Sequence, residues 1–266
     1  MRTDKSISAC ITSPPYATQR ALYEGVIESE YPEWTLNWMK KLIPKLVDNG
    51  SVLIVIRPHL KDGQISDYVL KTRLALRADN WRECEELIWH KPDGPPLGST
   101  TRPRRTWESI LWFSRTSKPF VDLFACGNKN SGRVGAFAGS SRFDNEADNP
   151  IHGGQKSEFR KGTSRCSDVF QANVGSIERG VQHPAMFPTS LTDQLVQTFS
   201  LEGATVLDPF IGSGQTAISC RKFGRNYVGI DKKKEYADLA QERLKEAEPP
   251  KTQEITPQSS AGNQGS

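Results

Sequence analysis

The four residues Ser13-Pro14-Pro15-Tyr16 carry the first side chains in this chain that could do chemistry, and they follow a short β-like run at residues 6–12. Two consecutive prolines cannot continue a strand ladder, so a rigid loop is expected there. A serine hydroxyl and a prolyl carbonyl on such a loop present two fixed acceptors for the hydrogens of an amine. The Tyr16 ring offers a face on which a planar base could stack. Taken alone, the tetrapeptide is more typical of an ordinary turn.

A second motif is the glycine loop, residues 208–214 with the sequence DPFIGSG, between a predicted strand and a predicted helix. Glycines let the backbone approach a ligand closely, and the first turn of a helix offers free N–H groups. Asp231 ends the next predicted strand, where a carboxylate can accept hydrogen bonds from ribose hydroxyls. Together these features indicate a nucleoside cofactor, and both NAD and S-adenosyl-L-methionine use this arrangement.

The charge of Asp208 favours one of these two cofactors. A carboxylate before the glycines would crowd a pyrophosphate, whereas it can face the cationic amino and sulfonium end of S-adenosyl-L-methionine. Beside a methyl donor, the tetrapeptide Ser13-Pro14-Pro15-Tyr16 could hold the amine that accepts the methyl group. The lone pair of an exocyclic amine is delocalised into its base, and acceptors that hold both amine hydrogens turn that lone pair toward the methyl group. The pattern therefore predicts methyl transfer to the amine of an extruded base.

Apolar periodicity predicts the elements that position these motifs. Strands are expected at residues 6–12, 51–56, 83–90, 109–114, 205–207 and 227–230, and helices at 34–47, 66–77, 190–200, 216–223 and 233–247. Their alternation predicts an α/β, doubly wound parallel sheet, with 83–90 and 109–114 as an antiparallel hairpin. The glycine loop lies too near the end of the sequence for its own unit to close a domain. It must pair with strands before residue 118, which is a circularly permuted order.

The motifs resemble, in this order, the β group of DNA amino-methyltransferases, and especially its N4-cytosine members. Those members characteristically carry Ser-Pro-Pro-Tyr where adenine-N6 enzymes usually carry Asp- or Asn-Pro-Pro-Tyr. The matching segments are ITSPPY (11–16), IWHKP (88–92), RRTWESILWFSRT (104–116), HPAMFPTSL (183–191), DPFIGSG (208–214) and GIDKKKEY (229–236). The resemblance implies a circularly permuted, Rossmann-like methyltransferase fold with direct transfer from the sulfonium to the amine. The sequence contains no Pro-Cys dipeptide, the motif that supplies the nucleophile of cytosine-C5 methylation.

The resemblance also assigns regions and residues. It implies a catalytic half at 1–117, a target-recognition region at 118–182 and a cofactor-binding half at 183–247, and composition predicts a disordered tail at 248–266. Ser13 and the Pro14 carbonyl would hold the amine, Pro15 belongs to the same catalytic loop, and Tyr16 would stack on the base. The expected cofactor-binding residues are Asp208, Phe210, Gly212, Ser213, Gly214 and Asp231, with His183 and Phe187 closing the pocket from the other side.

Positive charge gathers where double-stranded DNA would bind. Arg102, Arg104 and Arg105, with Lys91 nearby, form a basic cluster expected near the catalytic tip, where it would contact phosphates. Further lysines and arginines in 118–182 are spaced among glycines and serines, as a loop that follows a DNA groove requires. The net charge of +4, from 35 basic and 31 acidic residues, permits such a partner without requiring it.

Composition excludes several other classes. No apolar run is long enough to span a bilayer, and the first residues lack the pattern of a secretory signal, so membrane and secreted proteins are excluded. The five cysteines are scattered without a CxxC or Cys/His cluster, so neither a zinc site nor a disulfide framework is expected. An intracellular protein associated with DNA and carrying no metal fits best.

The N-terminus departs from the family pattern. Relatives usually have a further strand, followed by a Gly-Asp turn, before the serine tetrapeptide, and here only residues 1–5 precede the first strand. Either an edge strand is missing, the true start lies upstream, or the chain is truncated. Alternatives that stay open are adenine-N6 methylation, an RNA methyltransferase and an inactive DNA-binding relative, as are a homodimer and a cognate restriction endonuclease. A nicotinamide-dependent oxidoreductase would leave the tetrapeptide and Asp208 without a role.

Overall fold

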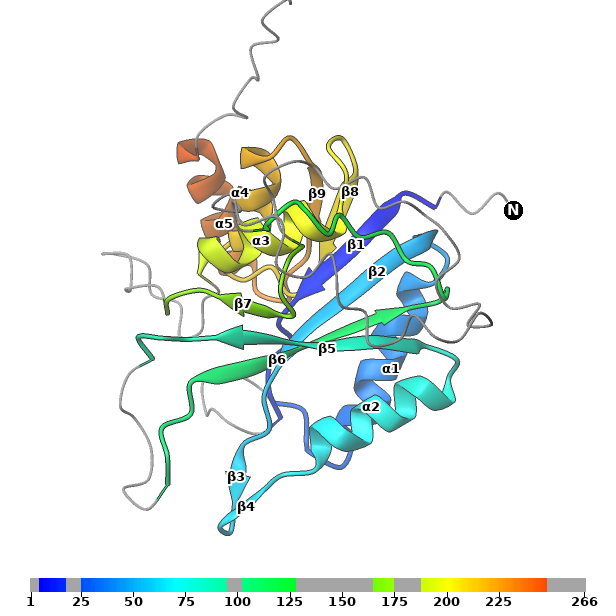
Figure 1. Ribbon diagram of the computed structural model, residues 1–266, viewed down its shortest axis with the longest axis vertical. Coiled ribbons are helices and arrows are strands. Elements are labelled where there is room, and N and C mark those ends of the chain that lie inside the picture. Colours follow the sequence, from blue (N-terminus) through cyan, green and yellow to red (C-terminus); the bar gives the residue numbers. More distant parts are fainter. Residues whose placement is uncertain (1–4, 18–24, 95–101, 128–164, 175–187, 248–266) are drawn as a thin grey trace, which may run out of the picture.

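The computed structural model describes residues 5–17, 25–94, 102–127, 165–174 and 188–247. A seven-stranded sheet of order β7-β5-β6-β2-β1-β8-β9 lies at its centre (Figure 1). Its strands are β1 (Ile7–Thr12), β2 (Leu46–Ile56), β5 (Arg82–His90), β6 (Trp107–Ser114), β7 (Val169–Gln171), β8 (Thr205–Asp208) and β9 (Asn226–Gly229). The helices are α1 (Tyr31–Leu42), α2 (Tyr68–Ala78), α3 (Thr189–Phe199), α4 (Gln215–Lys222) and α5 (Lys234–Glu246). A separate two-stranded hairpin consists of β3 (Leu60–Lys61) and β4 (Gln64–Ile65).

Strand pairing confirms the predicted fold class. β1 is parallel to both β2 and β8, and β8 is parallel to β9. The glycine-loop unit at the end of the sequence therefore joins the N-terminal strands, as the permuted order requires. β5 and β6 form the expected antiparallel hairpin, and β6 also pairs antiparallel with β2. β7 was not predicted, because its three residues within 118–182 are too few to show a period.

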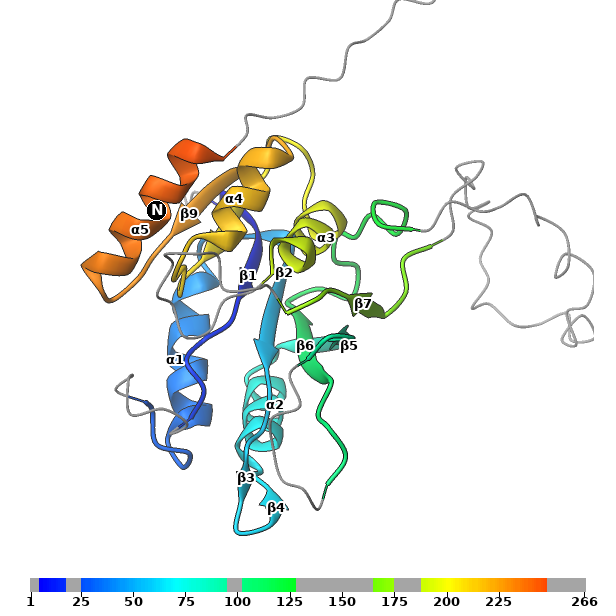
Figure 2. The same cartoon turned by 90° about the vertical axis from the view of Figure 1, so that its left-hand side faces the viewer.

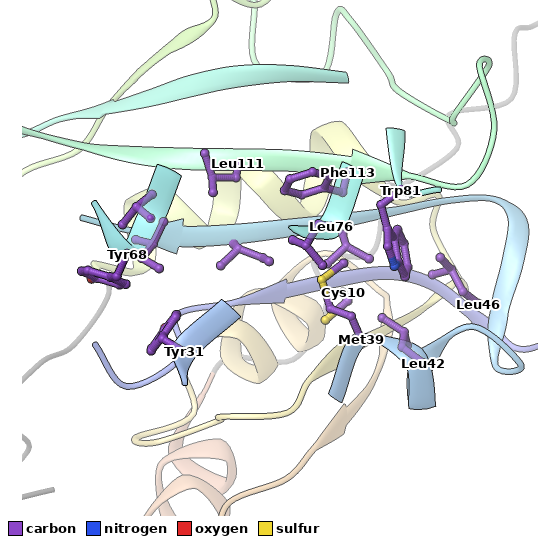
Figure 3. Close-up of a cluster of buried hydrophobic side chains, with 14 of the residues drawn as sticks. Cys10, Tyr31, Met39, Leu42, Leu46, Tyr68, Leu76, Trp81, Leu111 and Phe113 are labelled. Carbon is purple, nitrogen blue, oxygen red and sulfur yellow. The ribbon is translucent and has the colours of Figure 1, made fainter. Parts of the chain in front are cut away.

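Helices cover both faces of the sheet (Figure 2). Side chains alternate along β2, which is buried on both sides. On one face Val52, Ile54 and Ile56 belong to the cluster that includes residues of α1 and α2 (Figure 3). On the other face Leu53 and Val55 belong to a cluster with the apolar side of α3. A central strand with both faces covered explains why this segment is almost entirely apolar.

One predicted helix ends earlier than expected. The spacing of apolar residues predicts a helix to residue 47, but α1 ends at Leu42 and β2 already begins at Leu46. Pro44 explains the difference, because proline has no N–H to donate to the helix and its ring clashes with the preceding turn. The Asp48-Asn49-Gly50 segment, expected to end the helix, lies inside β2 instead.

β9 forms one edge of the sheet, and all four of its residues are exposed. Among the residues that the structure describes, no strand lies beyond it. The family's additional edge strand is thus not formed by these residues, and β7 supplies the seventh strand at the opposite edge. In the same described ranges, no helix is long and apolar enough to cross a membrane.

Candidate active site

The tetrapeptide and the glycine loop lie next to each other at the point in the sheet where the chain connections run in opposite directions. From β1 the chain passes through α1 to β2 on one side, and from β8 it passes through α4 to β9 on the other side. The carboxyl ends of β1 and β8 flank this switch point, which is where ligands bind in open α/β sheets. The tetrapeptide follows β1 directly, and the glycine loop begins at the end of β8.

Asp208 joins the two loops through hydrogen bonds. Its carboxylate accepts bonds from the hydroxyls of Thr12 at 2.6 Å and Thr216 at 2.8 Å, and from the Phe210 amide at 3.1 Å. The side chain is buried, and this burial raises the pKa of Asp208 to about 6 in spite of the three donors. The prediction placed this carboxylate against the cationic end of a cofactor. In the structure both oxygens accept hydrogen bonds from protein donors, so the group also holds the two loops together.

The glycine loop has the conformation that its sequence predicts. Gly212 and Gly214 adopt positive φ angles of 50° and 87°. A Cβ on Gly214 would lie 2.9 Å from the Cβ of Ala240, so this position needs glycine for two reasons. Asp231 accepts the Gly212 amide at 3.0 Å and the Lys233 amide at 2.9 Å. The carboxylate at the end of β9 thereby holds the loop beside β8.

Aromatic residues of α1 pack on the same loop. The Phe210 ring lies 5.4 Å from the Trp34 ring and 5.7 Å from the Trp38 ring, measured between centroids. The two tryptophans lie four residues apart, so they share one face of α1. Their contacts fix the position of the Phe210 ring just after β8. Ser213 is buried, and its carbonyl accepts a hydrogen bond from Arg243 of α5.

The tetrapeptide is anchored through its tyrosine. Pro14 is buried, while Ser13, Pro15 and Tyr16 are half-buried. The Tyr16 hydroxyl donates to Glu108 at 2.7 Å. Burial and the charge of Glu108 raise the pKa of Tyr16 well above its usual value, and a hydrogen bond with the Ser13 side chain lowers it in part. The hydroxyl is thus fixed inside the protein while part of the residue remains accessible.

Lys91 lies in a setting that differs from the prediction. It was grouped with the basic cluster for DNA phosphates, but its ammonium pairs with Glu108 and its side chain is 12% exposed. The same ammonium lies 3.9 Å from the centroid of the Trp89 ring. Burial lowers the pKa of Lys91, and the neighbouring Glu108 opposes this shift. The residue therefore serves the interior of the site, because its charge faces a carboxylate.

The three arginines of the cluster are exposed. Their guanidinium groups donate hydrogen bonds to backbone carbonyls of neighbouring loops. Arg104 donates to the Gly94 carbonyl at 2.7 Å and Arg105 donates to the Pro58 carbonyl at 2.7 Å. Arg102 donates to the carbonyl of Gly63, between β3 and β4. These contacts connect the loop before β6 to the chain that follows β2 and β5. The result is a basic surface at the same end of the sheet as the tetrapeptide.

Several site residues were not found from the sequence. Thr12 donates the hydrogen bond that holds Asp208, and Glu108 accepts the one that holds Tyr16. Trp34 was interpreted only as one residue of an amphipathic helix. The signal for Thr12 was available, because it is a polar residue at the end of a buried strand. The predicted residues His183 and Phe187 lie outside the described residues. The described residues contain no group of three or more His, Cys, Asp or Glu side chains that could hold a metal ion.

Comparison with known proteins places this geometry in a family. The model of a family described as DNA methylase, which covers N6 and N4 amino-methyltransferases, matches residues 7–242. The Type II methyltransferase M.ScaI of Streptomyces caespitosus is 28% identical over 247 residues, which cover 88% of this chain and 73% of that protein. M1.MboII of Moraxella bovis is 27% identical, with 89% of this chain and 88% of that protein covered. The chain belongs to the N6/N4 family of DNA methylases.

Solved structures share the fold. The cytosine-N4-specific PvuII DNA methyltransferase superimposes with a TM-score of 0.67 at 22% identity, covering 91% of this chain and 80% of that one. M1.HpyAVI, solved as a complex with S-adenosyl-L-methionine, gives a TM-score of 0.60 at 20% identity, with coverages of 90% and 89%. The predicted methyltransferase fold is therefore confirmed.

Proposed function

We propose that this protein transfers a methyl group from S-adenosyl-L-methionine directly to the N4 amine of a cytosine flipped out of double-stranded DNA, within a specific sequence. The observation that carries this proposal is the juxtaposition of the two loops at the switch point. Thr12, which precedes the serine tetrapeptide, donates its hydroxyl to Asp208 at the start of the glycine loop at 2.6 Å. A base held by one loop and a donor held by the other would meet between β1 and β8.

The residues of the glycine loop fit the methyl donor. Gly212 and Gly214 carry no side chains where α4 begins, so the backbone there can come close to a ligand. Asp231 is half-buried at the end of β9, in position to accept ribose hydroxyls as well as its two amides. S-adenosyl-L-methionine supplies an electrophilic methyl group on a sulfonium when it is bound. Phe210 and Ser213 line the same loop, and Asp208 holds it in place.

The tetrapeptide would hold the acceptor. Ser13 and the Pro14 carbonyl accept the two amine hydrogens, and Tyr16 stacks on the flipped base. The nitrogen lone pair forms the new C–N bond while the S–CH₃ bond breaks, and the amine then loses a proton. No covalent enzyme intermediate is needed. Consistent with this, Cys10 beside the site is fully buried. Its burial, and to a smaller extent the charge of Asp208, raises the pKa of its thiol well above the usual value.

Serine in the first position supports cytosine as the target, because adenine enzymes of this group usually carry Asp or Asn there. The DNA duplex would lie against Arg102, Arg104 and Arg105, with residues 118–182 reading the sequence. The relatives named above are Type II methyltransferases. On that basis we extend the proposal to a modification enzyme with a cognate endonuclease, acting as a monomer or a homodimer.

The deciding experiment is incubation with S-adenosyl-L-methionine and duplex DNA of mixed sequence, followed by digestion and mass analysis of the nucleosides. N4-methylcytosine is the expected product. N6-methyladenine would retain the reaction and overturn the base assignment. Product on RNA alone would overturn the DNA substrate. Binding of the cofactor without any product would contradict the proposed activity and indicate an inactive DNA-binding relative.

A further inference from the structure

The Tyr16 ring is held at both of its ends. Its backbone follows two prolines on the loop after β1, and its hydroxyl donates to Glu108 of β6 at 2.7 Å. The ring also packs against the buried cluster that includes residues of α1 and α2. A ring held at both ends can move only by turning about its long axis, and this packing opposes the turn. The part of the ring that stays accessible therefore has a set position.

The acceptor of the Tyr16 hydroxyl is itself fixed by neighbouring strands. Glu108 is 9% exposed, and its second oxygen pairs with Lys91, which directly follows β5. The Lys91 ammonium lies 3.9 Å from the centroid of the Trp89 ring, and the Trp89 indole donates to the Ala172 carbonyl at 2.9 Å. Groups from β6, from β5 and from the residue after β7 thus hold the hydroxyl in place.

Stacking alone does not account for these contacts. A base stacks on an aromatic ring whether or not the ring carries a hydroxyl, so phenylalanine would serve equally well. The Tyr16 hydroxyl is instead bound to a buried carboxylate, and hydrogen bonds to charged groups are stronger than those between neutral groups. A buried ion pair is often no more stable than an apolar pair of the same size, so stability does not account for Glu108 and Lys91 either.

We propose that Glu108, held by Lys91, is a positioning residue that fixes the Tyr16 ring as the stacking surface for the flipped base. The inference rests on the function proposed above and concerns where the base comes to rest. Methyl transfer needs the amine close to the sulfonium and aligned with it, and a displacement of about 1 Å can cost on the order of 10²-fold in rate. A ring that is fixed before the base arrives keeps the amine in line.

Two variants remove the bond from its two sides. Tyr16→Phe keeps the ring without its hydroxyl, and Lys91→Met/Glu108→Leu replaces the ion pair by apolar side chains, so that no buried lysine is left unpaired. We expect each to lower kcat about 10- to 100-fold. The Kd for S-adenosyl-L-methionine should stay unchanged, because the glycine loop is untouched. The two variants combined should lower kcat no further than either alone, because both remove the same bond.

Glu108→Gln separates positioning from a structural role. The glutamine oxygen can accept from Lys91 while its NH₂ group bonds the Tyr16 oxygen, so the link survives without the negative charge. Its kcat should therefore lie well above that of Lys91→Met/Glu108→Leu. If Glu108 only neutralised Lys91, the order would be reversed, because the apolar pair removes both charges whereas the glutamine leaves the lysine uncompensated. Denaturant unfolding of both variants separates losses of stability from losses of kcat.

Photo-crosslinking reports on the position of the ring without turnover. Irradiated 5-iodocytosine crosslinks to an aromatic ring on which it stacks. Duplex DNA of mixed sequence that contains 5-iodocytosine should therefore crosslink to Tyr16 of the parent protein, and mass analysis of the peptides locates the site. The yield at Tyr16 should be largely retained in Glu108→Gln and should fall in Lys91→Met/Glu108→Leu.

Arg73→Met/Glu83→Leu is the matched control. Glu83 has a similarly buried side chain, 9% exposed, and pairs with Arg73 near the other end of β5. This variant should keep the kcat and the crosslink of the parent protein.

Parent levels of kcat and crosslink in Lys91→Met/Glu108→Leu would overturn the proposal, as would a further loss when this variant is combined with Tyr16→Phe. A parent protein that crosslinks at Tyr16 but makes no product overturns the proposed function, and the crosslink yields of the variants then decide the role of Glu108. A product of N6-methyladenine overturns only the base assignment, and the kcat values of the variants then decide.

Discussion

Thr12 and Asp208 lie 196 positions apart in the sequence and share a 2.6 Å hydrogen bond between the ends of adjacent strands. The bond joins the last residue of β1 to the last residue of β8, so the loops that follow these strands start from a common point. Thr216, the second residue of α4, donates to the other oxygen of Asp208. A single buried carboxylate therefore joins the starts of the donor and acceptor loops.

Thr12→Val should loosen this junction. The valine keeps the size of the side chain but leaves Asp208 without one donor, which should destabilise the fold by about 1–3 kcal/mol. The glycine loop then loses one of its fixed points, so the Kd for S-adenosyl-L-methionine should rise. Denaturant unfolding and calorimetric titration measure the two effects.

Thr72→Val is the control for this variant. Thr72 is a buried threonine of α2 whose hydroxyl donates to the Tyr68 carbonyl at 2.8 Å, away from the switch point. It should lower stability without changing the cofactor Kd. Equal cofactor affinity in the Thr12 and Thr72 variants would show that the Thr12–Asp208 bond does not position the loop.

Because the pKa of Asp208 is raised in the folded state, the free energy of unfolding should depend on pH. Its folded value of about 6 lies above the ordinary value of 3.8, so the folded state binds more protons between these two pH values. The contribution of Asp208 to stability is therefore fully present below pH 4 and is lost as the pH rises through 6. The loss should be on the order of 3 kcal/mol. Asp208→Asn should remove this component from the difference between the two stability curves. Parallel curves for parent and variant from pH 4 to 7 would contradict the assignment.

Contiguous motifs could be read from the sequence, but their partners could not. The tetrapeptide and the glycine loop each consist of consecutive residues after an apolar strand, so local rules were enough to place both. Glu108 lies 92 positions from Tyr16, and it is the pairing of β6 with β2, and of β2 with β1, that brings it to the tetrapeptide. Such a contact depends on sheet order and register, which no local pattern contains.

Two further differences have local physical causes. Apolar spacing continues past Pro44, so periodicity alone extended the helix into β2. Lys91 stands close in sequence to the arginine cluster, and sequence distance suggested a shared role. In the structure Lys91 follows the last residue of β5 and pairs with Glu108 of the neighbouring strand β6. The arginines instead extend from the loop before β6 and stay exposed.

Ser13→Ala should separate turnover from cofactor binding. The alanine removes one acceptor of the target amine and leaves the glycine loop intact, so kcat should fall on the order of 10²-fold while the cofactor Kd stays unchanged. Asp231→Ala should show the reverse pattern, because the loss of its bonds to Gly212 and Lys233 disorders the cofactor loop. Single-turnover assays and calorimetry distinguish the two. Full turnover by Ser13→Ala with unchanged product would contradict its role.

The exposed arginines should determine how DNA binding depends on salt. Each phosphate contact releases condensed counterions, so losing one should flatten the plot of log K against log salt by about 0.9. Alanine at Arg102, Arg104 or Arg105 should each have this effect, with little change between DNA sequences.

Lys91→Met should leave the same salt slope unchanged, because its ammonium faces Glu108 and not the solvent. Arg115→Ala is the matched surface control. Arg115 follows the far end of β6, where it donates to the Asp79 carbonyl at 2.8 Å, away from the tetrapeptide. Fluorescence anisotropy at several salt concentrations provides the slopes. If the Arg115 variant lowered the slope as much as the Arg105 variant, DNA would not lie at the catalytic end of the sheet. A reduced slope in the Lys91 variant would show that this buried lysine reaches the phosphates after all.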